Sequence, residues 1–434
     1  MKIVRIIARL NVGGPARHVI WLTAALQDTE YESLLVTGVV PPNEDDMSYF
    51  AEELRVKPLV IPEMSREISP KDALTVWKLY RLLLRERPDL VHTHTAKAGT
   101  VGRLAGFMYR WLTPATLLGR PRRCRFVHTY HGHIFHSYYG PLKTRLFIFI
   151  EKMLARLSTD RIVVISQQQF REIHERFGVG RREQFSVIRL GFDLTEFDGW
   201  ESRRDILRRE LGTESRDVLV GIVGRLTGIK NHSLFLEAVA RFKEQHGVLP
   251  KGGGRVRFLI IGDGQLRQTL EDKTRSLGLE GDVLFLGTRN DPENFYPALD
   301  VVALTSHNEG TPLTLIEAMG CARPFVATVV GGVVDLLGEK DLDESDGVGF
   351  QVCEHGVSVR PDDAESFSGA LEYIIRDEQK RLEMGRRGRR FVEENYSIER
   401  LLSDIRNLYR GLEKEQSGES WESGESREST RSSL

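Results

Sequence analysis

The sequence predicts an α/β protein built from two Rossmann-like, doubly wound domains. Short apolar runs alternate with amphipathic segments from the first residue onward, which is typical of buried parallel strands joined by crossover helices. This series occurs twice, before and after a polar stretch at residues 199–205, and 434 residues exceed the usual size of one core. We therefore expect an N-terminal domain over residues 1–198 and a C-terminal domain over residues 199–396.

The first series contains seven apolar runs that predict strands. They cover residues 2–8, 33–40, 58–62, 90–94, 125–130, 161–166 and 185–190. The intervals predict helices, most clearly at residues 70–86, where apolar residues recur at helical spacing until Pro88 ends the pattern.

The second series predicts five more strands, followed by a helical end. The strands cover residues 217–224, 256–262, 283–287, 300–305 and 324–328. Residues 365–412 show only a helical pattern, and we expect residues 397–412 to pack back on the N-terminal domain. Residues 413–434 are rich in serine and alternating charge, so they bury too little apolar surface to offset the entropy of ordering. We expect this tail to be disordered.

The composition excludes several classes of protein. With 61 basic and 62 acidic residues, the net charge of −1 argues against a dedicated nucleic-acid-binding protein. Cys124, Cys321 and Cys353 form no CxxC pair, which argues against a disulfide framework or a zinc module. The sequence shows no signal-peptide pattern, and no apolar stretch approaches the roughly 18 residues of a membrane-spanning helix. We therefore expect a cytoplasmic protein.

The segment SHNEGTPLTLIEAMG, residues 306–320, predicts a helix whose first turn could bind a phosphate. Thr311 suits the N-cap and Pro312 the first helical position, and a helix N-terminus presents free N–H groups to an anion. Glu309 would then flank the anion, and Glu317 would reach the part of the ligand beyond it, such as a ribose diol. The alternative is that Glu309 is a surface acid and Glu317 an ordinary charge on the helix face.

Two cations follow the strand 217–224 at its carboxyl end. Gly224 opens this loop, and Arg225 and Lys230 would neutralise a diphosphate as a planar fork and a point charge. Ordinary solvation of the loop is the alternative. After the next strand, Gly264 would let the backbone pass close to a ligand or turn into the following helix.

Gly13 and Gly14 follow the first strand, in RLNVGGPARH. Paired glycines let the backbone approach a ligand closely, and Arg17 and His18 lie on the first turn of the helix that follows. The pattern falls short of the full GxGxxG fingerprint, so it gives weak support for NAD. A purely structural turn is the alternative.

Six histidines lie near the ends of two strands of the first series. They are His92, His94, His128, His131, His133 and His136. Imidazole is a common transition-metal ligand, but no HExxH motif or neighbouring carboxylate completes a site. We therefore expect no metal, and favour one or two histidines bonding a sugar or phosphate while the others pack. The DLD triplet at residues 341–343 lies in an acidic run, and we interpret it as a solvated loop.

Residues 101–190 form a basic region. They contain sixteen lysines or arginines against five acidic residues, interleaved with aromatic residues. Such a surface on a helix suits attachment to an anionic membrane. Nucleic acid is the competing interpretation, but no recognition motif accompanies the charge, and a solvated helix face is the ordinary alternative.

In their order along the chain, these motifs resemble glycosyltransferase family 4, whose members are retaining enzymes of the GT-B fold. The resemblance covers residues 1–412 and rests most on Glu309 and Glu317 in EGTPLTLIE. The strings VGRLTGIKN, LIIGDGQLR, GGPARH and HGH support it. It implies two Rossmann-like domains facing across a cleft.

The resemblance also implies roles for individual residues. Arg225 and Lys230 would stabilise the diphosphate leaving group, Glu317 would hold the ribose, and Glu309 would bind hydroxyls of the donor sugar. His131 would lie near the anomeric centre or the acceptor. The remaining donor contacts would come from Gly13, Gly14, Gly224, Gly264, Gly310, Thr311, Pro312, Leu313 and Thr314, mostly through backbone amides. No metal or other cofactor is implied.

We therefore expect a transferase that moves a hexose or N-acetylhexosamine from a nucleotide diphosphate sugar, UDP-linked by preference. Its acceptor would be a glycan or a lipid-linked sugar of bacterial surface polysaccharide synthesis, and it would bind the inner face of the plasma membrane peripherally. Two alternatives remain open. One is a UDP-sugar epimerase of the same fold, which needs no acceptor, and the other is a noncatalytic binding component of a polysaccharide assembly complex.

Overall fold

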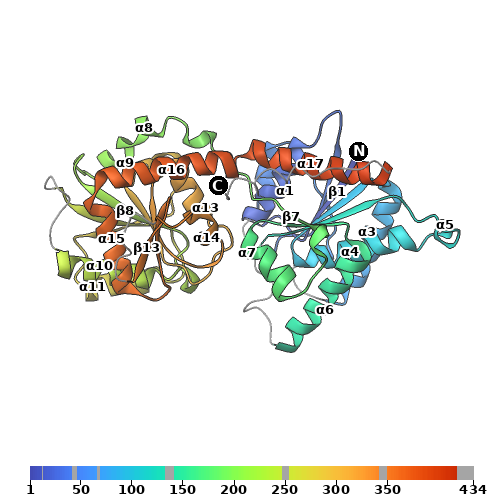
Figure 1. Cartoon of the computed structure of the whole chain (residues 1–434), viewed down its shortest axis with the longest axis horizontal. Helices are drawn as coiled ribbons and strands as arrows, with labels where there is room; N and C mark the ends of the chain where they lie inside the picture. Colours follow the sequence, from blue (N-terminus) through green and yellow to red (C-terminus); the bar gives the residue numbers. More distant parts are fainter. Residues whose placement is uncertain are drawn as a thin grey trace, which may run out of the picture. The chain divides into compact units, whose positions relative to one another are not determined.

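The chain folds into two compact units, each built around one sheet with helices on both faces (Figure 1). The first unit contains Met1–Arg189 and the chain from Glu399 onward, and the second contains Leu190–Ile398. The computed structural model describes residues 1–11, 13–41, 46–65, 69–131, 141–246, 254–341 and 349–417. Within these residues, no helix combines the length and the hydropathy that crossing a bilayer requires.

The sheet of the first unit has seven parallel strands in the order β3-β2-β1-β4-β5-β6-β7. Each predicted strand is present; β4 and β5 have the predicted bounds, and the other five end earlier than predicted. The strands are β1 (Lys2–Ile7), β2 (Glu32–Thr37), β3 (Leu59–Val60), β4 (Leu90–His94), β5 (Arg125–Tyr130), β6 (Arg161–Val164) and β7 (Phe185–Val187). Parallel pairing places the carboxyl ends of β4 and β5 at the same edge, and these ends carry the histidines.

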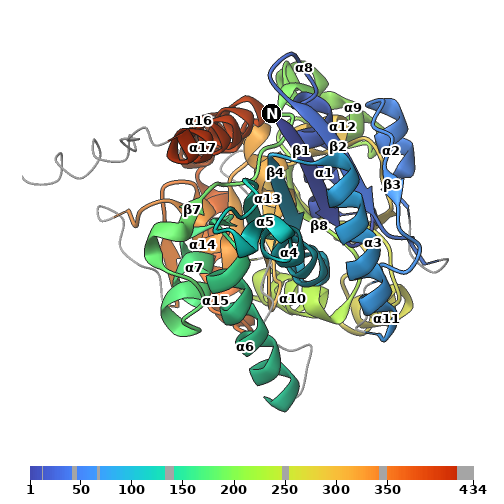
Figure 2. The same cartoon turned by 90° about the vertical axis from the view of Figure 1, so that its right-hand side faces the viewer.

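Helices cover both faces of this sheet. They are α1 (Gly14–Ala25), α2 (Ser48–Glu53), α3 (Lys71–Glu86), α4 (Ala96–Trp111), α5 (Pro114–Leu117), α6 (Pro141–Ser158), α7 (Gln167–Phe170) and α17 (Ile398–Ser417), with the short helices η1 (Arg171–Arg176) and η2 (Arg182–Gln184). α3 and α4 lie side by side (Figure 2) and bury Leu83 and Val101 with Val91 of β4. In a separate cluster, α1 and α17 bury Leu22 and Tyr409 with residues of β1 and β4.

The final helix, α17, belongs to the first unit. Its apolar face joins the core of that unit, and Arg406 and Arg410 pair with Asp28 and Glu30 at 2.7 Å and 2.8 Å. The predicted disorder from residue 413 onward is wrong for residues 413–417, which continue the helix, because Glu415 forms an ion pair with Arg161 at the start of β6. Residues 418–434 lie outside the described residues.

The sheet of the second unit also has seven strands, in the order β10-β9-β8-β11-β12-β14-β13. They are β8 (Val218–Val223), β9 (Val256–Ile261), β10 (Val283–Gly287), β11 (Val301–Leu304), β12 (Phe325–Thr328), β13 (Phe350–Val352) and β14 (Gly356–Val359). The five predicted strands are present. β13 and β14, an antiparallel pair at one edge, were not predicted because each is only three or four residues long.

The helices of this unit again form two layers. They are α8 (Trp200–Arg203), α9 (Asp205–Glu210), α10 (His232–His246), α11 (Arg267–Ser276), α12 (Pro292–Ala298), α13 (Leu313–Gly320), α14 (Val334–Leu337), α15 (Ala364–Arg376) and α16 (Glu378–Tyr396), with the single turns η3 (Thr195–Phe197), η4 (Gly228–Lys230) and η5 (Gly331–Val333). α10, α11 and α15 share one apolar cluster, whereas α9, α12, α13 and α16 share the other.

The boundary between the units lies at residues 189–190 instead of the predicted residue 198. The segment from Leu190 belongs to the second unit because Phe192 donates its backbone N–H to the carbonyl of Tyr396 at 2.8 Å. Phe197 is buried in the same cluster as Leu315 and Met319 of α13.

Candidate functional site

The loops at the carboxyl ends of β8, β9, β11 and β12 contain most of the predicted donor-binding residues. These strands are parallel, so their carboxyl ends share one edge of the second sheet. The loops pack backbone against backbone: a Cβ atom at Gly332 would lie 2.0 Å from the carbonyl oxygen of Gly310, and one at Gly264 would lie 2.7 Å from that of Leu226. Glycine is therefore required at both positions. Gly264 was among the predicted site residues and Gly332 was not, although the glycine pair Gly331-Gly332 after a strand is a visible signal.

Lys230 and Glu309 form an ion pair at this edge of the sheet. The Nζ atom of Lys230 donates to Oε1 of Glu309 at 2.7 Å, and the Ser306 hydroxyl donates to the same oxygen at 2.5 Å. The buried Thr305 hydroxyl fixes the loops to each other by donating to the carbonyls of Lys230 and Asn231 at 3.1 Å and 2.9 Å. The two motifs that the sequence predicted separately thus meet as one ion pair, which Thr305 and Ser306 support.

Glu317 lies on α13 and accepts a hydrogen bond from the phenol of Tyr296 at 2.8 Å. Tyr296 lies on α12 and is fully buried, and burial with the nearby carboxylate raises its pKa well above the ordinary value. The phenol therefore stays protonated and orients the Glu317 carboxylate. Nothing in the local sequence pattern pointed to Tyr296, which is 21 residues away in the chain.

α13 begins one residue later than predicted. Pro312 is the N-cap residue, with an extended ψ of 105°, and Leu313 is the first helical residue, so the assignment of Thr311 as N-cap is wrong. Pro312 also lacks an amide hydrogen, which leaves Gly310, Thr311, Leu313 and Thr314 as the possible amide donors. In addition, the Thr314 hydroxyl oxygen is buried and has no hydrogen-bond partner in the described part of the chain. The start of α13 therefore offers an unused hydroxyl beside its free amides.

Arg225 and Gly224 occupy the loop after β8. Arg225 is exposed, and among the described residues no ion pair involves its side chain. The Lys230 side chain passes the Gly224 backbone, with its Cε 3.7 Å from where a Cβ would stand. The structure thus brings Lys230, Glu309 and Gly224 together and leaves the Arg225 guanidinium in solvent at the same sheet edge.

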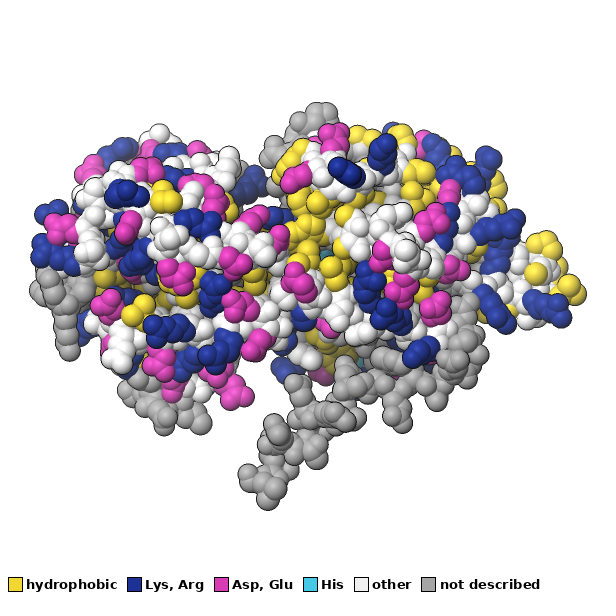
Figure 3. Space-filling view, turned by 90° about the horizontal axis from the view of Figure 1, so that it is seen from above, with side chains coloured by type: hydrophobic (Ala, Val, Ile, Leu, Met, Phe, Trp, Pro, Cys, Tyr) yellow, Lys and Arg dark blue, Asp and Glu magenta, His cyan; other side chains and the backbone are white. Residues whose placement is uncertain are grey.

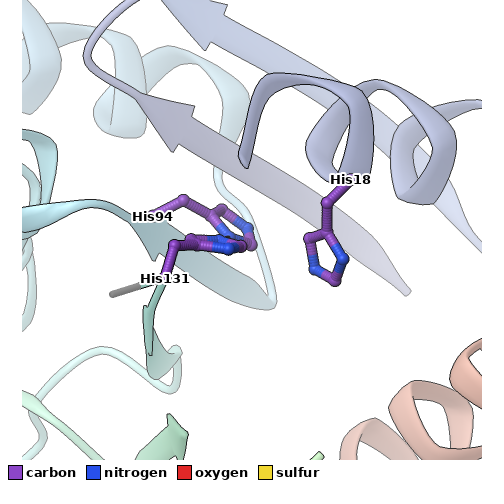
Figure 4. Close-up of side chains that lie close together, drawn as sticks. All are labelled: His18, His94 and His131. Atoms are coloured by element: carbon purple, nitrogen blue, oxygen red, sulfur yellow. The ribbon is translucent and has the colours of Figure 1, made fainter. Parts of the chain in front are cut away.

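A second group of predicted residues lies in the first unit, where three histidines gather (Figure 4). His94 ends β4, His131 follows β5, and His18 comes from α1. The Nδ1 of His94 and the Nε2 of His131 are 2.9 Å apart, and the ring of His18 lies edge-on at 4.9 Å from the ring of His131. His18 was predicted on the first turn of a helix, but its proximity to the other histidines was not predicted.

The three imidazoles are neutral near pH 7. Desolvation by burial lowers the pKa of His131 to about 3 and the pKa values of His18 and His94 well below 6.5. Neutral rings offer one N–H donor and one lone pair each, which suits sugar hydroxyls and also metal ions. One nitrogen of each ring lies within 4.8 Å of the others, so this set could hold a transition metal. The expectation of no metal stays a prediction.

The other histidines separate into packed and undescribed groups. His92 bonds the Tyr409 hydroxyl at 2.6 Å and the Thr129 hydroxyl at 2.7 Å, and His128 bonds Thr93 at 2.9 Å. His92 and His128 are therefore packed in the core of the first unit. His133 and His136 lie outside the described residues, as do residues 342–343 of the DLD triplet.

Gly13 and Gly14 lie at the start of α1. Gly14 opens the helix, one residue before the predicted Pro15. A Cβ at Gly14 would meet no atom within 4 Å, and one at Gly13 would meet only Pro15 and Asn11 near that limit. Packing within the first unit therefore does not demand glycine at either position.

The buried histidine cluster should make the stability of the protein depend on pH. The three histidines titrate near 6.5 when unfolded and well below this when folded, so the unfolded state binds more protons between these values. The free energy of unfolding should fall as the pH drops from about 6.5 towards 3. In urea denaturation at pH 7 and pH 5, His94→Gln should show a smaller loss than the parent protein, and an equal loss would contradict this.

Two doubly wound α/β units define a two-domain protein of the class whose ligands bind beyond the carboxyl ends of the strands, and the second unit carries a cation–carboxylate pair and a free helix start at that edge. Comparison with known proteins is more specific. Residues 203–391 match the family model described as glycosyl transferases group 1, and residues 12–196 match the one described as glycosyltransferase family 4. The chain is therefore a family-4-like glycosyltransferase of the GT-B fold, and the predicted fold is confirmed.

Individual relatives agree with this assignment. The Escherichia coli UDP-Gal:alpha-D-GlcNAc-diphosphoundecaprenol alpha-1,3-galactosyltransferase is 29% identical over 82% of this chain and 84% of its own. The capsular polysaccharide biosynthesis glycosyltransferase CapM of Staphylococcus aureus is 24% identical over 83% of this chain and 86% of its own. The crystal structure of Anabaena HepE in complex with UDP superposes with a TM-score of 0.72 and 22% identity, covering 95% of this chain and 100% of that one.

Proposed function

We propose that this glycosyltransferase moves a hexose or N-acetylhexosamine from a UDP-sugar to a glycan or lipid-linked acceptor, with retention at the anomeric carbon. The observation that carries the proposal is the Lys230–Glu309 pair beside the start of α13. A cation, free amides and two carboxylates lie at one sheet edge, and this combination suits a nucleotide diphosphate sugar. The printed names of the E. coli relative and of the HepE complex, which mention UDP-Gal and UDP, support this choice of donor.

In the proposed reaction, the bond between the anomeric carbon and the diphosphate oxygen breaks as the acceptor oxygen bonds to that carbon. Negative charge then develops on the departing UDP. Arg225 and Lys230, together with the amides of Leu313 and Thr314, stabilise this charge, and electrostatic stabilisation of this kind is usually the largest catalytic contribution. The acceptor attacks on the side from which UDP leaves, and a phosphate oxygen takes its proton.

The carboxylates bind the two ends of the donor. Glu309 accepts hydrogen bonds from hydroxyls of the sugar and stabilises positive charge at the anomeric carbon. Glu317, oriented by Tyr296, accepts hydrogen bonds from the ribose diol. For the first unit, the resemblance to the family supports assigning donor contact to Gly13 and Gly14 and acceptor contact to His131. No metal takes part, because the cations and amides supply the positive charge.

The test is mass spectrometry of products from a panel of sugar nucleotides incubated with bacterial lipid extract. We expect one sugar to be transferred, with UDP released in equal amount and unchanged turnover in EDTA. Conversion of the donor without acceptor would identify the epimerase instead. Binding of donor without any turnover would identify a noncatalytic component, and loss of turnover in EDTA would assign a metal to His18, His94 and His131.

We also propose that the protein works at an anionic membrane, through the basic region 101–190. The acceptor in the printed name of the E. coli relative is a diphosphoundecaprenol, which is a membrane lipid. A polybasic and apolar surface would hold the enzyme where such an acceptor resides.

A further inference from the structure

An arginine-rich cavity opens at the amino ends of β5 and β6 in the first unit. Its volume is about 340 Å³. Five arginines line it: Arg110, Arg125, Arg156, Arg161 and Arg181. Only two carboxylates, Asp160 and Glu415, belong to the lining, so this cavity carries an excess of positive charge among the described residues.

The two carboxylates are already engaged by three of the arginines. Asp160 bridges Arg110 and Arg125, and it also accepts the backbone N–H of Phe126 at 2.7 Å. Glu415 pairs with Arg161.

Two arginines of the cavity carry unneutralised charge. Arg156 and Arg181 are exposed, and neither takes part in an ion pair within the described chain. Arg125 adds a buried Nε that has no hydrogen-bond partner among the described residues. Two guanidinium groups without a carboxylate partner and one unpartnered N–H therefore line the same hollow, which is the chemistry that binds a phosphate.

Two apolar side chains belong to the otherwise polar lining of the cavity. Trp111 and Leu157 belong to its lining and are 40% and 42% exposed. The turn at α5 contacts this lining, because the Thr116 hydroxyl donates to the carbonyl of Arg110 at 3.5 Å. On and after this turn, Leu117 and Leu118 are 90% and 80% exposed. In Figure 3, hydrophobic side chains lie beside lysines and arginines at the end of the unit that Figure 1 labels α5.

The exposed leucines belong to a fixed turn. The N-cap residue of α5, Thr113, is buried, and its hydroxyl accepts the backbone N–H of Thr116 at 3.3 Å. Large apolar side chains held in water on such a turn mark a binding surface.

From this combination we infer that the cavity binds the phosphate of an anionic phospholipid headgroup while Trp111, Leu117 and Leu118 enter the bilayer interface. A bilayer suits both the arginines and the leucines, since its phosphate groups can pair with the guanidinium groups and its hydrocarbon can bury the leucine side chains. A soluble phosphate would leave the leucines in water. The inference rests on the proposed function only in expecting a membrane. The cavity lies at the amino end of β5 and His131 follows its carboxyl end, so a lipid held in the cavity leaves the histidine cluster uncovered.

The test is co-sedimentation of the full chain with phosphatidylglycerol vesicles and with phosphatidylcholine vesicles. The parent protein should bind the first and not the second. The double variant Arg156→Glu, Arg181→Glu, which leaves the Asp160 bridges intact, should bind phosphatidylglycerol at least about tenfold more weakly, since each basic residue near an anionic surface contributes about 1 kcal/mol. The variant Leu117→Ser, Leu118→Ser should also bind more weakly.

Two arms separate this inference from simpler explanations. The matched control is Arg386→Glu, Arg390→Glu on α16, which makes the same charge change on exposed residues of the second unit. An equal loss in this control, or unchanged binding by the cavity variant, would overturn the inference. Saturable binding of inorganic phosphate to the cavity without vesicle binding would assign it to a soluble ion. Turnover with a short-chain acceptor in detergent tests the proposed function independently, and the cavity variant should keep it.

Discussion

Lys230→Ala should lower kcat by about 10²–10³-fold, because it removes the point charge that stabilises the departing diphosphate. The structure holds this ammonium group 2.7 Å from Glu309, at the edge that the start of α13 also faces. The change in kcat should exceed the change in KM for the donor, since the charge on the leaving group develops mainly in the transition state. Steady-state kinetics of UDP release measures both.

The matched control is Lys243→Ala. Lys243 lies on α10 in the same unit and pairs with Asp282 on the surface. The Lys243→Ala variant should have the same kcat as the parent protein. A rise in KM for Lys230→Ala with an unaltered kcat would show that Lys230 binds ground state and transition state equally, which contradicts its proposed role. Thermal unfolding of both variants distinguishes a catalytic effect from a folding defect.

Glu151→Ala should destabilise the first unit by about 3–5 kcal/mol, because it leaves a buried guanidinium without a counter-charge. Arg103 and Glu151 are both fully buried, and the Nη2 of Arg103 lies 2.7 Å from each oxygen of the carboxylate. The Tyr130 hydroxyl donates to the same carboxylate, and burial next to that charge raises the pKa of Tyr130. The measurement is the free energy of unfolding from urea denaturation.

Two further variants isolate the origin of this loss. Glu175→Ala removes an exposed acid from the same unit and should change stability by less than about 0.5 kcal/mol. The double variant Arg103→Met, Glu151→Leu removes both charges and should recover most of the loss, because well-packed apolar pairs often replace buried ion pairs without cost. A double variant as unstable as Glu151→Ala would show that lost packing between α4 and α6 is responsible.

Most strands could be predicted because a strand that is buried on both faces has a continuous apolar run in its sequence. The segment VRFLII shows this, since the last four residues of β9 are buried, whereas VLFLG keeps an apolar run in the half-buried edge strand β10. β13 and β14 lacked this signal, since FQV and GVSV pair at an edge and are too short to show a period. The unit boundary was misplaced because the contact of Phe192 with Tyr396 joins residues some two hundred positions apart, which no local pattern records.

For the candidate site too, local sequence patterns were predictive and contacts between distant residues were not. The sequence pointed to Glu309, Glu317 and Lys230 because glycine, proline and charge follow strands at characteristic positions. Tyr296 and Ser306 were missed because their value comes from the carboxylates beside them in the fold. His18 could have been joined to His94 and His131 only by knowing that α1 and the ends of β4 and β5 meet.

The return of α17 to the first unit bears on how the protein is synthesised. Leu401, Ile405 and Tyr409 fill the cluster that contains Ile3 and residues of α1. During translation, the N-terminal half therefore emerges with an unfinished interior, and the whole second unit must leave the ribosome before the missing helix arrives. A fragment ending near residue 189 would keep that apolar face open to water, so producing this half alone requires supplying α17 by fusion or as a separate peptide.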